Sequence, residues 1–243
     1  MTPDLIAHLE AGLRKPPRGD ENLPHMSDTV CDRQTWARRQ GEEFMPPDFR
    51  TIMKWALGEQ FEKVTADALQ AELEPQGYTI QRDVAMLWQG LTGHADFVAR
   101  WDYPNYDSRS FLLEIKSTSF LRGKVPEEAS PWYVEQAAEY AAALDIRRFG
   151  VLVGCRESGK LAPVFWFDLD GQHYDDDYTW RQWAQFRAAE IVTLTDPEAE
   201  MPPAEPRTGW ACKTCRWHGC EKNPAYVDQD VIAKLEESYA RNS

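Results

Sequence analysis

Three side chains suited to hydrolytic chemistry fall on two short segments that read as neighbouring strands. Asp96 lies on the first segment, and Glu114 and Lys116 lie two residues apart on the second. Because side chains alternate along a strand, Glu114 and Lys116 share one face while Ile115 points to the other. Two carboxylates offer hard oxygen ligands for Mg²⁺ or Mn²⁺, and a lysine beside them can orient or help deprotonate a metal-activated water. The alternative is an acid–lysine pair on a solvated face.

A sheet is needed to bring these side chains together. Runs rich in apolar, β-branched and aromatic residues, separated by Pro, Asn, Asp and Gly, predict five strands. The first three are expected to form an antiparallel meander. The expected strands are 78–88, 91–101, 110–118, 149–155 and 164–169. Gly93 either leaves room for a close backbone approach or marks a bulge.

Helices are expected on both sides of these strands. A long helix from 48 to about 74 carries apolar residues at helical spacing. Its predicted buried face consists of Ile52, Trp55, Ala56, Phe61, Val64, Ala68 and Leu69. A helix over 131–144 places Gln136 and Tyr140 one turn apart on the same face. Further helices are expected over 179–191 and around Cys31, the latter capped by Ser27 or Asp28.

The order of these residues resembles the RecB-like branch of the PD-(D/E)xK nuclease superfamily. Asp96, the Glu114-x-Lys116 strand and the Gln136-x-x-x-Tyr140 helix match its motifs II, III and IV. The resemblance implies an α/β, restriction-endonuclease-like fold with a central mixed sheet flanked by helices. It also implies a divalent-metal-dependent deoxyribonuclease.

The same resemblance implies a role for each site residue. Asp96, Glu114 and the Ile115 carbonyl would coordinate the metal. Lys116 would position the attacking water or neutralise developing charge. Gln136 and Tyr140 would hold that lysine or touch the DNA strand.

A further metal ligand is expected on the long helix. Gly58 and Glu62 lie four residues apart and are similar to a Gly-x-x-x-His or Gly-x-x-x-Glu element of the RecB-like family. The resemblance makes Glu62 the ligand. Glu59 is the competing choice, and a solvated glutamate is the plain alternative.

The cysteines form a second motif. Three of the five are close together near the C-terminus: Cys212, Cys215 and Cys220. Such spacing favours a bound metal over disulfides in a protein without an export signal. Cys31 is the candidate fourth ligand, because Cys155 ends an apolar strand and is expected to be a small buried hydrophobe. A metal site with four cysteine ligands would join the N- and C-terminal segments of the chain.

This layout resembles the four-cysteine RecB-like nucleases, which include CRISPR-associated exonucleases and AddB-type helicase–nuclease subunits. The resemblance implies that Cys31, Cys212, Cys215 and Cys220 hold a [4Fe–4S] cluster. Four residues separate Cys215 from Cys220, one fewer than in that group. A structural zinc, with three cysteines and His218, is the alternative.

The length and net charge of the chain limit these interpretations. With 243 residues the chain suits a single domain, with a catalytic core over 48–193 and cluster-binding segments at 27–40 and 208–222. Its net charge of −13 repels a polyanion, so nucleic acid requires a local basic patch. Neither a membrane span nor a secretory signal is evident, which predicts an intracellular, cytoplasmic protein.

The combined expectation is a DNA exonuclease acting on single-stranded ends in DNA processing, recombination or CRISPR adaptation, with a helicase or other DNA-processing protein as a possible partner. A narrow channel would use a few cations and stacking rings. The candidates are Arg33, Arg38, Arg39, Arg122 and Lys124 with Trp36, Trp132 and Tyr133. The alternatives are a sequence- or structure-specific endonuclease of the same fold, and a non-catalytic, metal-stabilised module that binds DNA or protein.

Overall fold

The structure is a computed structural model. It describes residues 24–27, 31–101, 109–118, 126–156, 158–174, 177–205, 212, 215–217 and 219–221. The candidate cations Arg122 and Lys124 lie outside the described residues, as do the candidate cap Asp28 and the candidate zinc ligand His218. Within the described part, no helix combines the length and apolar character needed to cross a membrane.

A five-stranded mixed sheet forms the centre of the fold, in the order β1-β2-β3-β4-β5. The strands are β1 (Tyr78–Trp88), β2 (Leu91–Trp101), β3 (Phe111–Thr118), β4 (Arg148–Cys155) and β5 (Phe165–Asp168). The expected antiparallel meander of β1, β2 and β3 is confirmed. β4 pairs parallel to β3 and antiparallel to β5. A parallel pair needs a crossover connection, which the helix between β3 and β4 supplies.

The longest strand pair is the β1–β2 hairpin, and the bounds of both strands agree with the prediction. Trp88 pairs with Leu91 across the two-residue turn Gln89-Gly90, and both turn residues have positive φ. Two consecutive positive φ values are typical of the turn that matches strand twist. This turn sets the register of the strand that carries Asp96.

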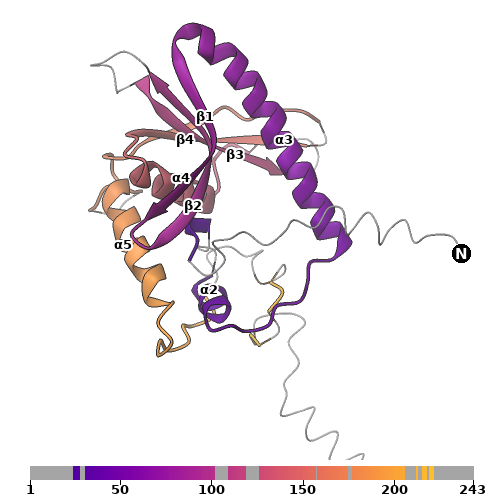
Figure 1. The fold of residues 1–243 in the computed structure, drawn as a ribbon, viewed down its shortest axis with the longest axis vertical. Coiled ribbons are helices and arrows are strands. Elements are labelled where there is room, and N and C mark those ends of the chain that lie inside the picture. The colour runs from indigo at the N-terminus through magenta and orange to yellow at the C-terminus, as the bar shows by residue number, and fades with distance from the viewer. Residues whose placement is uncertain are drawn as a thin grey trace, which may run out of the picture.

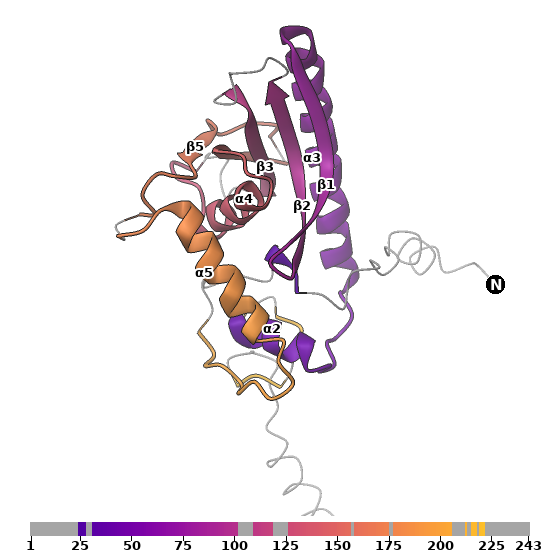
Figure 2. The ribbon, with the colours of Figure 1, turned by 60° about the vertical axis from the view of Figure 1, so that its left-hand side comes forward.

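Helices cover both faces of the sheet. They are α2 (Asp32–Arg39), α3 (Phe49–Leu73), α4 (Pro131–Ala143) and α5 (Trp180–Thr193). α3 crosses one face, while α4 packs on the other and against α5 (Figure 1). Turned by 60°, the view separates α3 behind the β1–β2 hairpin from α4 and α5 on the opposite side (Figure 2). The site residues on β2 and β3 therefore lie in the middle layer.

Two apolar cores result from this layering. The larger joins α4, α5 and one sheet face, and the smaller joins α3 and the other face. α3 lies close to the sheet because Gly154 leaves space for the Phe61 ring, whose Cζ would be 1.9 Å from a Cβ at that position. Gly58 likewise brings α3 near Ser117 of β3.

The predicted buried face of α3 is partly wrong. Ile52 is buried as expected, but the side chains of Trp55 and Val64 are 51% and 65% exposed. Ala66, which was not assigned to that face, is buried instead. Apolar residues are distributed around this helix, so their spacing alone does not identify which side packs.

The start of α2 also differs from the prediction. The helix begins at Asp32, and Cys31 occupies the N-cap position in an extended conformation. The expected capping residue Ser27 lies in a separate short turn. Cys31 is therefore placed at the end of a helix rather than within one.

Candidate active site

The site begins where β2 and β3 separate. Their backbone pairing ends at Phe97 and Leu113. Beyond this point, the Asp96 Oδ2 accepts a hydrogen bond of 2.8 Å from the Ile115 backbone N–H. The Asp96 carboxylate thus bridges two strands that no longer pair through their backbones.

The other side of β2 is irregular at the same position. The β1–β2 ladder pairs Arg82 with Phe97 and Val84 with Ala95, but it skips Asp83 and Asp96. Asp83 has a φ of +46°, in the left-handed region. Backbone outliers of this kind are enriched at functional sites, where surrounding structure maintains them.

Glu114 and Lys116 lie together beside Asp96. Glu114 is fully buried, and the Lys116 Nζ forms an ion pair with its Oε1. Neither carboxylate oxygen of Glu114 has a well-oriented hydrogen-bond donor among the described residues. A buried carboxylate with unused acceptor capacity is costly unless a cation compensates it.

The protonation equilibria follow from burial. Burial raises the pKa of Glu114 to about 8, and the charge of Asp96 adds to the shift. Burial also raises the pKa of Asp96, against the opposing effect of Lys116. For Lys116, burial alone would lower the pKa, but Glu114 and Asp96 raise it above its usual value. The lysine is therefore a stable ammonium beside two carboxyl groups.

α4 supplies the other predicted pair. The Gln136 Nε2 donates a 2.7 Å hydrogen bond to the Tyr140 hydroxyl, and both side chains are buried. Burial raises the pKa of Tyr140, and the charge of Glu114 adds to the shift. A Cβ at Gly93 would lie 2.7 Å from the Tyr140 ring, so Gly93 permits the close approach. α4 thereby places a neutral phenol beside the charged cluster.

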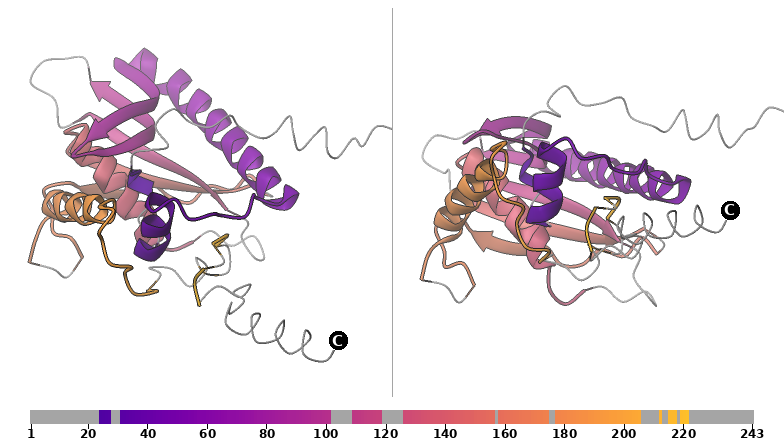
Figure 3. Two further views of the ribbon diagram at one scale, coloured as in Figure 1. Left: turned by 60° about the horizontal axis from the view of Figure 1, so that its bottom comes forward. Right: turned by 90° about the horizontal axis from the view of Figure 1, so that it is seen from below.

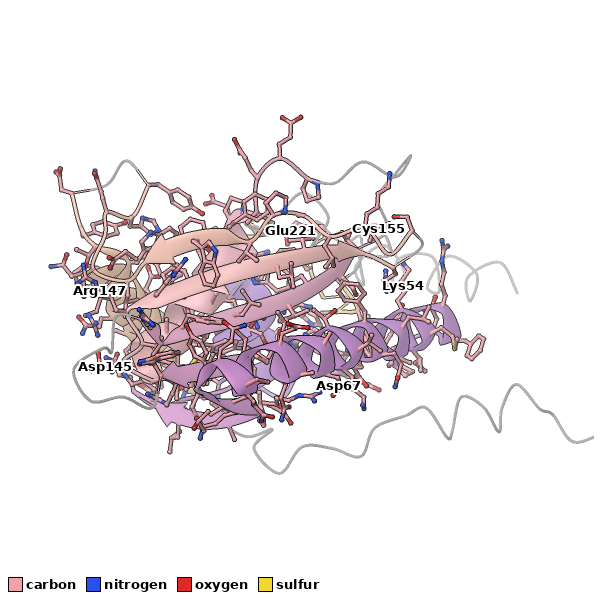
Figure 4. All side chains as sticks on the ribbon, turned by 90° about the horizontal axis from the view of Figure 1, so that it is seen from above. Lys54, Asp67, Asp145, Arg147, Cys155 and Glu221 are labelled. Carbon is pink, nitrogen blue, oxygen red and sulfur yellow. The ribbon has the colours of Figure 1, made fainter. Side chains whose placement is uncertain are left out.

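One pocket of about 700 Å³ is lined by all six predicted site residues of β2, β3 and α4, namely Asp96, Glu114, Ile115, Lys116, Gln136 and Tyr140. α3 forms its opposite wall and contributes both Glu59 and Glu62. The charge of Glu62 raises the pKa of Glu114, which favours Glu62 over Glu59 as the residue closer to the cluster. In Figure 4, α3 runs along the sheet with Lys54 toward the same end as Cys155, where β4 finishes.

Two contacts in this pocket, which join His94 to Asp83 and to His25, were not predicted. His94, two residues before Asp96 on β2, has its Nδ1 3.0 Å from the Oδ1 of Asp83. His25 stacks on His94 with ring centroids 6.2 Å apart. The two-residue spacing of His94 and Asp96 on a strand could have indicated a shared face. The left-handed conformation of Asp83 has no signal in the sequence.

The donor set suits a hard divalent cation, although the described residues do not form a preassembled metal site. Within them, no three His, Cys, Asp or Glu side chains converge as metal ligands. Lys116 neutralises Glu114 in this arrangement. Carboxylate and carbonyl oxygens from Asp96, Glu114 and Ile115 nevertheless have the chemistry that Mg²⁺ and Mn²⁺ prefer.

The four predicted cysteines lie near one another, although as described they do not converge as metal ligands. Cys31 interacts electrostatically with Cys212 and Cys215, and Cys215 interacts with Cys212 and Cys220. Burial raises the pKa of Cys31 and of Cys215, and the neighbouring cysteines add to both shifts. Cys155 is buried on β4, as expected. No disulfide joins the described cysteines.

α2 and the C-terminal cysteine segment lie side by side (Figure 3). Arg33 is buried, donates to the Pro202 carbonyl at 2.6 Å and forms an ion pair with Glu221. The Trp36 Nε1 donates to the Ala199 carbonyl at 2.8 Å. Arg33 therefore holds these segments together and does not face a DNA channel as predicted, whereas Trp36 is partly buried against Trp217.

Comparisons with known proteins add information on the fold. No protein-family model and no curated protein matches the sequence. The crystal structure of SSO0001 aligns over 94% of this chain and 98% of its own, with 16% identity and a TM-score of 0.50. A structure from Eubacterium rectale named "Putative exonuclease" aligns over 96% and 97%, with 11% identity and a TM-score of 0.38. The similarity to SSO0001 shows that the chain shares a known mixed α/β fold.

Proposed function

We propose that the chain is a divalent-metal-dependent deoxyribonuclease that degrades single-stranded DNA from an end. The observation that carries the proposal is the meeting of Asp96, Glu114 and Lys116 in a pocket where two strands separate. Two carboxylates and an ammonium in one recess are the groups that phosphodiester hydrolysis needs. The alternative, an acid–lysine pair on a solvated face, does not explain why Glu114 is fully buried.

Each side chain has a distinct role in this proposal. Asp96 and Glu114, with the Ile115 carbonyl and Glu62, would hold Mg²⁺ or Mn²⁺. When bound, the metal lowers the pKa of a coordinated water and stabilises charge on the phosphate. The Lys116 ammonium, held by Glu114, would orient that water or neutralise charge developing on the phosphate.

α4 would keep the lysine in place. Tyr140 is buried beside Glu114 and Lys116, and Gln136 fixes its hydroxyl. The Tyr133 ring centroid is 5.8 Å from the Lys116 Nζ, a distance suited to a cation–π contact. Gln136 and Tyr140 therefore act as positioning residues in this proposal, and either could also touch the strand.

Preference for a strand end follows from charge and pocket shape. In a protein of net charge −13, carboxylates outnumber cations, which disfavours a broad basic face that could hold a long duplex. A recessed site instead accepts one flexible strand, as expected for an exonuclease in DNA processing, recombination or CRISPR adaptation. An endonuclease of the same fold is the alternative that a circular substrate tests.

The experiment compares end-labelled linear DNA with a covalently closed single-stranded circle of the same sequence, with and without Mn²⁺. Wild-type protein should degrade the linear strand in a metal-dependent manner and leave the circle. Asp96→Ala, Glu114→Ala and Lys116→Ala should each reduce the rate by about a thousandfold or more, because these residues act as a unit. Full activity in Glu114→Ala would exclude the proposed site.

We also propose that Cys31, Cys212, Cys215 and Cys220 hold a [4Fe–4S] cluster. Their arrangement supports this, because Cys31 and Cys215 each lie near Cys212, Cys215 also lies near Cys220, and cysteine thiolates are the ligands of iron–sulfur clusters. Anaerobically purified protein should be brown, and Cys31→Ser should bleach it and lower soluble yield, whereas Cys155→Ser should not. A colourless protein with one bound zinc would show that the site is a structural zinc site instead.

A further inference from the structure

Trp55 has an unusual environment for a large aromatic residue. It lies on α3, its side chain is 51% exposed, and it lines the pocket that contains Glu114. Packing explains the buried residues of α3, but it does not require an indole at an exposed pocket wall. A half-exposed indole beside a recess offers a flat face to a ligand.

The position of Trp55 along α3 relates it to the candidate metal site. Trp55, Gly58, Glu59 and Glu62 all line the pocket and follow one another at helical spacing. Seven residues separate Trp55 from Glu62, which corresponds to about 10 Å along the helix axis. A base stacked on Trp55 would therefore lie one or two nucleotides along the strand from a phosphate bound near Asp96 and Glu114.

The surroundings of Trp55 are cationic. The Arg216 guanidinium lies 5.7 Å from the Trp55 ring centroid, and its Nη1 donates to the Met45 carbonyl at 2.9 Å. The charge of Arg38 acts on Arg216, so a second guanidinium lies nearby. In the described part of the chain, no ion pair joins Arg216 to a carboxylate. Neighbouring guanidinium groups of this kind favour an anionic ligand.

The two sides of the pocket differ in their groups. Asp96 and Glu114 lie on the sheet side, whereas Arg216 lies over Trp55 on α3, where Lys54 and Glu59 also line the pocket. A metal suits the first region, and a phosphate-bearing group with a flat aromatic ring suits the second. An unpaired nucleotide carries both features, while a paired base has its faces covered by stacking neighbours.

We propose that Trp55 and Arg216 form a stacking subsite for one unpaired nucleotide of a single-stranded DNA substrate. This inference rests on the proposed nuclease function and names the part of the pocket that selects an unpaired strand. Arg216 follows Cys215 directly, and the Met45 N–H donates to the Arg216 carbonyl at 3.0 Å. The cysteine segment therefore forms one wall of the subsite as well as joining the chain ends.

The test measures binding without cleavage. The full-length protein is titrated into fluorescein-labelled (dT)10 in Ca²⁺ at moderate salt, and anisotropy gives Kd. Trp55→Ala should weaken binding about tenfold or more, the range expected for loss of one stacked base. Trp55→Phe should recover most of the affinity. Leu57→Ala is the matched control, because Leu57 is 52% exposed on the same helix.

Single abasic substitutions along the oligonucleotide locate the stacked base. One position near the end should weaken binding to wild-type protein but add little to the defect of Trp55→Ala. Arg216→Gln should lower the slope of log Kd against log salt by about one, whereas Trp55→Ala should leave it unchanged.

Three results would each overturn the subsite. They are a Kd for Trp55→Ala within twofold of wild type, abasic effects of equal size in both proteins, and absence of (dT)10 binding by wild-type protein. Cleavage by Asp96→Asn in Mn²⁺ tests the proposed function separately. An inactive Asp96→Asn with normal binding, combined with a neutral Trp55→Ala, would reject the subsite alone.

Discussion

Glu114→Gln should change the pH dependence of stability in a calculable way. Glu114 is fully buried, and its pKa is raised from 4.5 to about 8. A carboxyl group whose pKa is raised in the folded state stabilises the protein in its protonated form. That stability is fully present below pH 4.5 and is lost as pH rises to about 8.

The magnitude follows from linkage. One pKa unit corresponds to about 1.4 kcal/mol, so ionising Glu114 in the metal-free protein costs up to about 5 kcal/mol at pH 8 and above. At pH 7 the cost is about 3 kcal/mol. Gln resembles the protonated side chain and does not ionise. Asp96 remains near Lys116 in the variant, so the ammonium keeps a carboxylate neighbour.

The assay is urea denaturation in EDTA at pH 5, 6, 7 and 8. The free energy of unfolding of the variant, relative to that of wild type, should rise by about 1 kcal/mol per pH unit across this range. Glu72→Gln, at an exposed glutamate of α3, should show no such trend. Added Mn²⁺ should stabilise wild type more than Glu114→Gln at pH 8. A difference between variant and wild type that is constant from pH 5 to pH 8 would refute the shifted pKa of Glu114.

Two further predictions concern packing beside the site and a buried arginine on α5. Gly93→Ala should lower the free energy of unfolding by about 1–3 kcal/mol, because the new methyl group meets the Tyr140 ring; an unchanged urea midpoint would contradict that contact. Arg187→Met should cost about 3–5 kcal/mol, since Arg187 is 2% exposed, forms ion pairs with Asp32 and Glu190, and acts through its charge on the buried Glu139. Arg181→Met, which breaks more exposed ion pairs, should cost under about 1 kcal/mol, and an equal loss in both variants would refute the distinction.

The strands were predictable because their signals are local. The β1–β2 hairpin has a glycine-containing two-residue turn between two apolar runs, and its predicted bounds agree with the structure. The antiparallel order of the first three strands follows from short connections. The parallel pairing of β3 with β4 depends on how α4 crosses the sheet, and no single segment encodes it.

The candidate site was predicted as a set of residues but not as a geometry. The spacing of Glu114 and Lys116 gives a shared face, and the structure shows an ion pair there. The hydrogen bond from Ile115 to Asp96 exists because β2 and β3 separate, which depends on tertiary packing. The catalytic roles remain predictions for the activity assay.

The orientation of α3 shows why periodicity fails at this site. Trp55, Glu62 and Ala66 share one face of α3, and this face both lines the pocket and packs on the sheet. Ala66 is buried there, whereas Trp55 is half-exposed and is proposed to contact a ligand. Apolar spacing assigns Trp55 to the core because it does not show which part of the face stays open.

The net charge of the chain is also a poor guide to whether it binds DNA. The value of −13 sums 40 carboxylates and 27 cations over the whole chain, of which only some line the pocket. A metal would offset part of the negative charge around Glu114, and the screening length of about 8 Å at physiological salt limits the reach of that charge. Trp55, which Arg216 contacts, is about 10 Å from Glu62 along α3, so a phosphate beside Trp55 would respond mainly to nearby cations. An acidic protein can therefore bind a single strand at one basic site while repelling a duplex along the rest of its surface.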